Sequence, residues 1–188
     1  MKAAWYTEQG APKDVFQVGD MADPTPGPGQ VRVRMHASGA NPTDTYTRSG
    51  SRRRGMPYQR IIPHQDGAGV IDAVGEGVPR QRVGERVWLY MAQWQRAFGT
   101  AAQYITLPQA QAVTLPDAVS GEAAACFGIP ALTALHAVRC NGGVAGQDVL
   151  VTGGAGFLGS ALVARLRENG ESVRLLVRRP RGKQDGCS

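Results

Sequence analysis

Three glycines at a fixed spacing constrain this chain more than any other local pattern. Gly153, Gly156 and Gly159 are separated by two residues each. They follow an apolar strand predicted at 148–151 and precede a helix predicted at 160–168. A second apolar strand comes after that helix, and this strand-helix-strand order is typical of a parallel sheet buried on both faces.

A glycine loop in this position favours dinucleotide binding. Free backbone amides and the helix dipole attract an anion at the start of a helix, and a side chain at Gly156 would obstruct the approach of a pyrophosphate. The glycines that we assign to the cofactor are Gly153, Gly154, Gly156 and Gly159. A tight structural turn is the alternative interpretation.

The end of the second strand indicates which dinucleotide is bound. An acidic residue about 20 positions after the loop would bind the ribose hydroxyls of NAD. This chain has Arg178 and Arg179 at the corresponding place, and arginine pairs well with the 2′-phosphate of NADPH. We therefore expect NADPH as the cofactor, with an exposed basic tail that includes Arg181 and Lys183 as the alternative.

Residues 1–116 are punctuated by glycine and proline and indicate a series of short strands. Residues 30–37 alternate, with Val31 and Val33 on the apolar face, which predicts a half-buried strand. Further strands are predicted at 68–74, 86–90, 101–106 and 112–115. Many short strands at this spacing indicate a small closed or partly closed β-barrel.

The pattern changes to helix after this region, because Ser120 is suited to cap a helix that Pro130 then interrupts. The predicted fold class is mixed α/β. A β-barrel domain is expected at 1–120, and linker helices with a strand-helix-strand unit are expected at 121–188. A doubly wound dinucleotide domain uses about six strands, so we expect an incomplete Rossmann unit.

Composition excludes several classes of protein. The 188 residues contain no apolar run of about 18 residues and no signal-like start, so we expect no membrane partner and a cytoplasmic location. Three cysteines without a C-x-x-C pair predict neither a disulfide framework nor a structural zinc site. The net charge of +6 is concentrated at 52–54 and in the tail, and without a recognition pattern around it we expect no nucleic-acid partner.

Four ordered blocks of sequence carry a family resemblance. They are Ser38–Gly50, Asp66–Val78, Val83–Val87 and Gly128–Ala134. Their order and spacing resemble those of the zinc-independent quinone oxidoreductases related to ζ-crystallin, within the medium-chain dehydrogenase/reductase superfamily. The resemblance covers residues 1–156 and implies a GroES-like catalytic domain joined to a Rossmann domain.

Zinc-dependent alcohol dehydrogenases share that implied architecture, but they have a cysteine at the position of Asn41 and a histidine at that of Gln65. Neither side chain present here replaces a good zinc ligand. His64 lies next to the ligand position without partner cysteines, and we interpret it as structural, like His36 and His136. We expect no metal ion.

The resemblance places Asn41 and Tyr46 beside the substrate and the nicotinamide ring. The Asn41 amide would donate to a carbonyl oxygen, and the Tyr46 phenol would orient substrate or relay a proton. Asp44 is expected to order the loop from Asn41 to Tyr46, and Thr133 matches a family position near the cofactor. Without a metal, the implied reaction is hydride transfer from NADPH to a quinone or activated enone. A turn with good local hydrogen bonding is the alternative for 41–44.

Two features depart from the family pattern. The family commonly has a tyrosine shortly after Gly50, whereas this chain has arginines at 52–54, which predicts a cationic pocket mouth. Residues 149–180 also resemble the start of an extended short-chain dehydrogenase of the NAD-dependent epimerase type, which makes the pattern chimeric. The Tyr-x-x-x-Lys motif of short-chain catalysis is absent from the sequence.

An NADPH:quinone oxidoreductase acting on a small quinone or enone is therefore the predicted function. The competing hypothesis is a non-catalytic GroES-like remnant that acts as a binding or dimerisation module. Two strands alone leave apolar faces for a partner to cover, so a homodimer is one expected assembly.

Overall fold

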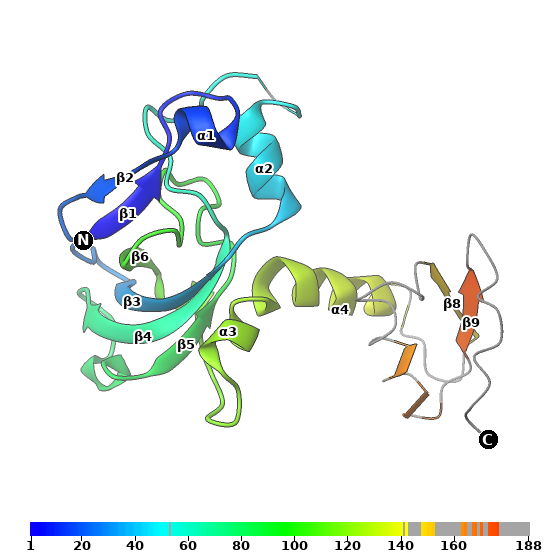
Figure 1. Ribbon diagram of the computed structural model, residues 1–188. Coiled ribbons are helices and arrows are strands. Elements are labelled where there is room, and N and C mark those ends of the chain that lie inside the picture. Colours follow the sequence, from blue (N-terminus) through cyan, green and yellow to red (C-terminus); the bar gives the residue numbers. More distant parts are fainter. Residues whose placement is uncertain are drawn as a thin grey trace. The chain divides into compact units, whose positions relative to one another are not determined.

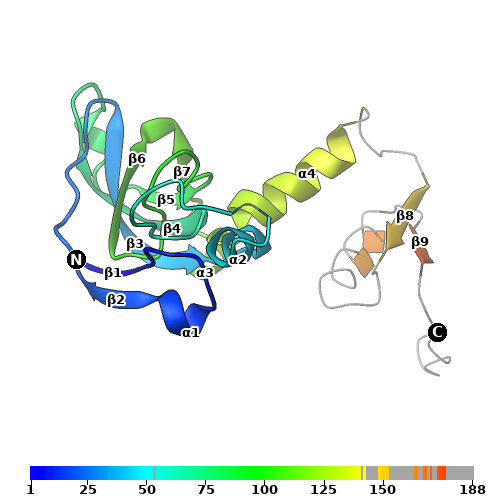
Figure 2. The ribbon, with the colours of Figure 1, turned by 90° about the horizontal axis from the view of Figure 1, so that it is seen from above.

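The computed structural model describes residues 1–52, 54–140, 142, 148–152, 163–164, 167–168, 170 and 173–176. Contacts divide the chain into two compact units, Met1–Ala134 and Leu135–Ser188 (Figures 1 and 2). Among the helices of the described residues, none combines the length and the hydropathy needed to cross a membrane.

The first unit is built on a five-stranded antiparallel sheet with the order β6-β3-β4-β5-β7 (Figure 1). Its strands are β3 Gln30–Gly39, β4 Asp66–Val74, β5 Arg86–Leu89, β6 Tyr104–Pro108 and β7 Ala112–Thr114. An antiparallel pair is formed by β1 Lys2–Trp5 and β2 Gln17–Asp20. Its helical segments are α1 Pro12–Val15, α2 Pro42–Ser49, η1 Arg80–Arg82, η2 Gln109–Gln111, α3 Gly121–Ala124 and η3 Phe127–Ala131. The boundary between the two units falls within α4 Leu132–Arg139.

This arrangement confirms the predicted mixed α/β class and all five strands predicted between residues 30 and 115. The sheet curves strongly, and β3 has register shifts against β4 at Arg32/Val33 and Met35/Ala37. Such irregularities bend a strand and increase its twist. Within the described residues β6 and β7 are the edges of the ladder, so the sheet corresponds to the partly closed form of the predicted barrel.

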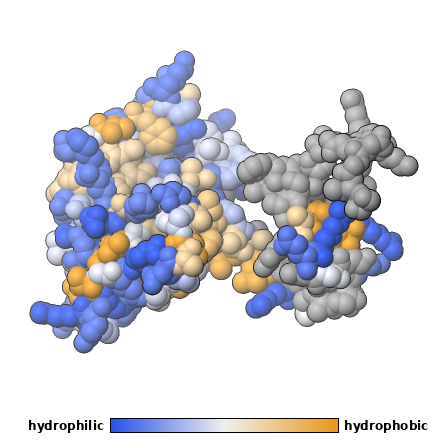
Figure 3. All heavy atoms as spheres, turned by 60° about the horizontal axis from the view of Figure 1, so that its bottom comes forward, coloured by the Kyte–Doolittle hydropathy of each residue, from blue (hydrophilic) through white to orange (hydrophobic). Residues whose placement is uncertain are grey.

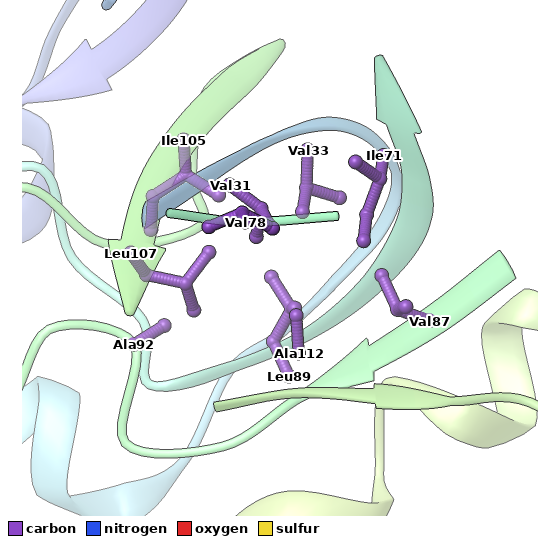
Figure 4. Packing of buried hydrophobic residues seen from close by; sticks show 10 residues of the cluster. All are labelled: Val31, Val33, Ile71, Val78, Val87, Leu89, Ala92, Ile105, Leu107 and Ala112. Carbon is purple, nitrogen blue, oxygen red and sulfur yellow. The ribbon is translucent and has the colours of Figure 1, made fainter. Parts of the chain in front are cut away.

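The hydrophobic core of the first unit lies in the hollow of this sheet (Figure 4). Its buried members are Val31, Val33, Ile71, Val78, Val87, Leu89, Ala92, Ile105, Leu107 and Ala112. Val31 and Val33 are fully buried, while Arg32 between them pairs with Asp72 on the other face, with Nε 2.9 Å from Oδ1. The alternation predicted for residues 30–37 is therefore confirmed.

The first unit extends beyond the domain boundary expected after residue 120. The helical segments α3 and η3 pack against β4 and β5, and Ala124 is fully buried there. The rings of Phe127 and Trp88 meet edge to face with centroids 5.8 Å apart. These contacts place the division after Ala134.

In the second unit, β8 Val149–Thr152 and β9 Val173–Leu176 pair in parallel. Val149 is in register with Val173, and Thr152 with Leu176. The parallel pairing predicted for this part of the chain is thus confirmed. In a parallel pair the two carboxyl ends share one edge, which is the edge where doubly wound sheets bind their ligands.

Candidate active site

The segment that we expected to be a loop, Asn41 to Tyr46, begins a helix, so that expectation is wrong. Helix α2 spans Pro42–Ser49 with Asn41 as its N-cap residue. Pro42 suits the first helical position, since its missing N–H would have no partner there. The Oδ2 atom of Asp44 accepts a hydrogen bond from the backbone N–H of Asn41 at 2.7 Å, which ties the start of the helix together.

The Asn41 side chain is bound to a buried carboxylate, Asp66. Asn41 Nδ2 donates to Asp66 Oδ2 at 2.8 Å, and the same oxygen accepts the backbone N–H of Ile129 at 2.8 Å. The Asp66 side chain is fully buried, and in the described part of the chain its Oδ1 has no hydrogen-bond partner. A Cβ on Gly128 would lie 2.0 Å from Oδ1, so glycine allows η3 to approach this closely. One carboxylate thus joins the start of α2 to η3.

Negative charge is disfavoured in this region. Burial raises the pKa of Asp66, although hydrogen bonds from Ile129 and Asn41 lower it in part. Burial also raises the pKa of Asp44 to about 6, and the neighbouring charge of Asp66 adds to that rise, while backbone hydrogen bonds from Asn41 and His64 oppose it. Both shifts follow from desolvation, which penalises an ionised carboxyl group.

The raised pKa of Asp44 predicts a stability that depends on pH. The pKa is about 6 in the folded protein against an ordinary value of 3.8 for an aspartate, so the folded state binds the proton more tightly. This contribution is fully present below the unfolded pKa and is lost as the pH rises through the folded pKa. We expect the free energy of unfolding to fall by about 2 kcal/mol from this residue as the pH rises from about 4 to about 6.

The comparison that checks this is urea unfolding of the wild type and Asp44→Asn across that pH range. The asparagine in the variant cannot bind or release a proton in this pH range. The free energy of unfolding of Asp44→Asn should therefore depend less on pH than that of the wild type. Asp117→Asn removes the same charge at a fully exposed site and should retain the wild-type slope. If the free energy of unfolding depended on pH equally in the wild type and in Asp44→Asn, the raised pKa of Asp44 would be contradicted.

A chain of hydroxyl groups lies beside Asp66. Thr100 Oγ1 donates to the backbone oxygen of Asp66 at 2.6 Å, and Ser38 Oγ lies 2.8 Å from Thr100 Oγ1 and 2.8 Å from His64 Nδ1. Burial lowers the pKa of His64, which favours a neutral ring in this hydrogen-bonding role. Ser38, Asn41 and Asp66 also line a cavity of about 350 Å³. The Asn41 side chain therefore faces this smaller cavity.

Tyr46 lines a second and larger cavity, of about 730 Å³. Its lining residues are Gln9, Thr43, Tyr46, Thr47, Arg52, Gly55, Pro57, Tyr58, Gln65, Met91, Gln93, Trp94, Gln95 and Ile129. This volume lies within the range of about 300–1,000 Å³ that is typical of small-molecule sites, as is a lining of aromatic and amide side chains. The arrangement can hold a flat ring system and offer it a few polar groups.

The loop that carries Trp94 forms one wall of the larger cavity. Met91 and Gln95 have positive φ angles of 50° and 55°, which side chains other than glycine seldom adopt. Trp94 is 55% exposed. On the face of the molecule shown in Figure 3, hydrophilic side chains surround smaller hydrophobic areas. An exposed tryptophan on a constrained loop offers an aromatic surface to a ligand.

The structure separates the residues that the sequence assigned to one site. Tyr46 lines the larger cavity, Asn41 lines the smaller one, and Asp44 is buried against the Asn41 backbone. Thr133 is exposed on α4. The other predicted cofactor residues, Gly153, Gly154, Gly156, Gly159, Arg178 and Arg179, lie outside the described residues.

Sequence reasoning did not identify the contribution of three residues near the two cavities: Asp66, Thr100 and Trp94. A carboxylate at the start of an apolar strand was the available signal for Asp66. At the positions compared with zinc ligands, Gln65 Oε1 accepts the backbone N–H of Gln93 at 3.1 Å, and the Asn41 amide is bound to Asp66. Among the described residues, no group of three or more His, Cys, Asp or Glu side chains could hold a metal ion.

Two family models match the chain. Residues 27–117 match the alcohol dehydrogenase GroES-like domain, and this range contains Asn41, Tyr46 and Asp66. Residues 149–188 match the NAD dependent epimerase/dehydratase family. The second match confirms the resemblance found in the sequence after residue 149.

Individual relatives agree with the first match. The quinone oxidoreductase of Rattus norvegicus is 34% identical over 181 residues, which cover 92% of this chain and 51% of the rat protein. A quinone oxidoreductase structure from Pseudomonas syringae pv. Tomato DC3000 is 32% identical, with a TM-score of 0.78 and coverage of 95% of this chain and 53% of that one. A mycobacterial protein solved with NADPH is 32% identical, with a TM-score of 0.71 and coverage of 93% and 50%.

The chain spans about half the length of the relatives that it matches. The residues that match the GroES-like domain include all five strands of the curved sheet and helix α2. The chain therefore carries an alcohol dehydrogenase GroES-like domain at residues 27–117, and its sequence and fold are similar to those of quinone oxidoreductases of the medium-chain dehydrogenase/reductase superfamily.

Proposed function

We propose that this chain supplies the substrate-binding half of an NADPH:quinone oxidoreductase, which reduces a quinone or activated enone without a metal ion. The observation that carries the proposal is the 730 Å³ cavity, which is lined by Tyr46, Gln65 and Trp94 among others. Aromatic walls suit a flat conjugated ring, and the phenol and amide are hydrogen-bond donors for its carbonyl oxygens.

The proposed chemistry needs little from the protein beyond positioning. Addition of a hydride to a quinone places negative charge on oxygen, and a donor held at that oxygen stabilises the charge. Tyr46 is assigned to this role, with proton relay to the reduced quinone. The Asn41 amide retains a second hydrogen after its bond to Asp66, and we assign this hydrogen to a carbonyl oxygen in the smaller cavity.

NADPH, when bound, would supply the hydride. The parallel pairing of β8 with β9 fits a dinucleotide-binding unit, because Thr152 precedes the glycine loop and the carboxyl ends of both strands share one edge. We assign the loop glycines to the pyrophosphate, Arg178 and Arg179 to the 2′-phosphate, and Thr133 to the vicinity of the cofactor. Homodimeric assembly and a cytoplasmic location stay predictions from the sequence.

The first test is a titration of the purified 188-residue protein with NADPH and NADH, followed by nucleotide fluorescence. Saturable binding that favours NADPH, together with quinone-dependent NADPH oxidation, would support the proposal. Quinone binding by a folded protein that responds to neither nucleotide would favour the non-catalytic binding module. A folded protein that binds neither quinone nor nucleotide would exclude both functions.

Tyr46→Phe is expected to lower turnover of quinone by about 10- to 100-fold, because the phenylalanine ring fills the same space without a hydroxyl group. The affinity for NADPH should stay at the wild-type value, since Tyr46 lines the substrate cavity. Tyr90→Phe is the matched control: its hydroxyl binds the Ala110 oxygen at 3.1 Å, away from the residues that line the cavity. Equal turnover by the two variants would remove Tyr46 from the proposed chemistry.

A further inference from the structure

The charge on the described lining of the larger cavity is positive. Among the described residues that line it, Arg52 is the charged one, and none is an aspartate or glutamate. The Arg52 guanidinium lies 4.2 Å from the centroid of the Tyr46 ring. In the part of the chain that the structure describes, no carboxylate forms an ion pair with Arg52.

A second guanidinium, that of Arg96, binds the backbone of Met91, which lines the cavity, and is held by neutral oxygens. It donates to the backbone oxygens of Ala92 at 2.9 Å and Met91 at 2.8 Å, and to Gln111 Oε1 at 2.7 Å. Burial lowers the pKa of Arg96, while the nearby Tyr58 opposes that change. Its positive charge is therefore not neutralised locally by any described carboxylate.

The stacking of Arg52 on Tyr46 determines which ligand chemistry can use this charge. A guanidinium that covers an aromatic face still presents N–H donors along its edge, and that planar fork matches the two oxygens of a carboxylate or sulfonate. Holding the fork in place on the ring also reduces the conformational entropy lost when an anion binds. The described residues that line the cavity include no anion, so a ligand is the source that we consider for one.

We propose that the larger cavity selects conjugated ring substrates that carry an acidic group, with Arg52 binding the carboxylate or sulfonate while the ring lies among Tyr46, Tyr58 and Trp94. This inference rests on the proposed function and names its substrate class. Arg52 is then a specificity-determining residue, since a neutral quinone would leave its charge without a partner.

The test uses two probes of nearly the same shape, anthraquinone-2-carboxylate and the neutral anthraquinone-2-carboxamide. Their affinities for the full chain are measured by calorimetry and by quenching of tryptophan fluorescence. We expect the carboxylate to bind roughly two- to fivefold more tightly, which is the range for a partly exposed charge pair, and the preference to shrink at high ionic strength.

Variants then assign the preference to one side chain. Arg52→Met should bring the ratio of the two affinities close to one, and Arg52→Lys, which keeps the charge, should retain part of it. Arg60→Met is the matched control, because Arg60 stacks on the Trp5 ring at 5.2 Å outside the cavity lining. Circular dichroism confirms that each variant is folded.

Any one of four results would overturn the inference. Equal affinity of the wild type for both probes would show that the cavity does not prefer acidic ligands, while the proposed binding of quinones would still stand. A carboxylate preference that survives in Arg52→Met, or an equal loss of both probes in that variant, would show that Arg52 does not recognise charge. Failure of the folded wild type to bind either probe would overturn the proposed function as well.

Discussion

Replacing Asp66 with alanine is expected to lower the free energy of unfolding by about 3 kcal/mol. The Asn41 amide and the Ile129 N–H share the Asp66 Oδ2 atom as acceptor, and the substitution would leave one buried and one partly buried donor without this partner. Two hydrogen-bond donors without an acceptor lower the stability of the variant, whereas removal of a buried carboxylate raises it. The expected loss of free energy of unfolding is the difference between these two effects. Urea unfolding followed by circular dichroism at neutral pH measures it.

Two further variants make the Asp66 result specific. Asp66→Asn keeps the shape and one acceptor oxygen, so its loss of stability should be smaller than that of Asp66→Ala. Asp117→Ala removes a fully exposed carboxylate and should change stability by no more than about 0.5 kcal/mol. If Asp66→Ala were as stable as Asp117→Ala, the two hydrogen bonds would contribute nothing to the fold.

Leu107→Ala is expected to lower the free energy of unfolding by about 2 to 5 kcal/mol. The side chain is fully buried in the core of the curved sheet, and Leu107 is in register with Val31 on β3 (Figure 4). Truncation removes apolar contacts and leaves a cavity that a sheet fixed by neighbouring strands fills poorly. The same urea experiment measures the change.

The control for the core prediction is Leu132→Ala. Leu132 is 39% exposed at the start of α4, and alanine is a good helix former, so the expected change is within about 0.5 kcal/mol. Similar losses in the two variants would mean that the Leu107 environment is less tightly packed than its burial indicates.

The strands were predictable because their signal is local. The alternation at Val31 and Val33 is a property of neighbouring residues, and the structure places both valines in the core. The parallel pairing of β8 and β9 was predictable for the same reason, since two apolar runs flank a glycine loop and a helical segment. Periodicity in the sequence directly reports burial in such elements.

Helix α2 could not be recognised in the same way. Thr43, Thr45 and Thr47 are β-branched residues with modest helix propensity, and Pro42 gives the segment the composition of a turn. The helix forms because Pro42 occupies its first position and Asp44 accepts the Asn41 N–H. Capping interactions, rather than propensity, decide the structure here.

The role of Asp66 was hidden for a different reason. Its partners are 25 residues earlier, at Asn41, and 63 residues later, at Ile129. No pattern within one segment reveals that three distant groups will meet in the interior. The division of Asn41 and Tyr46 between two cavities has the same origin, because it depends on how η3 packs against the sheet.

The bond from Ile129 to Asp66 has a thermodynamic consequence. Ile129 lines the larger cavity, and α4 begins at Leu132, three positions further along the chain. If a quinone changes the conformation of Ile129 and a nucleotide changes that of α4, their binding equilibria would be coupled. Because such coupling is reciprocal, nucleotide would then change quinone affinity by the same factor by which quinone changes nucleotide affinity.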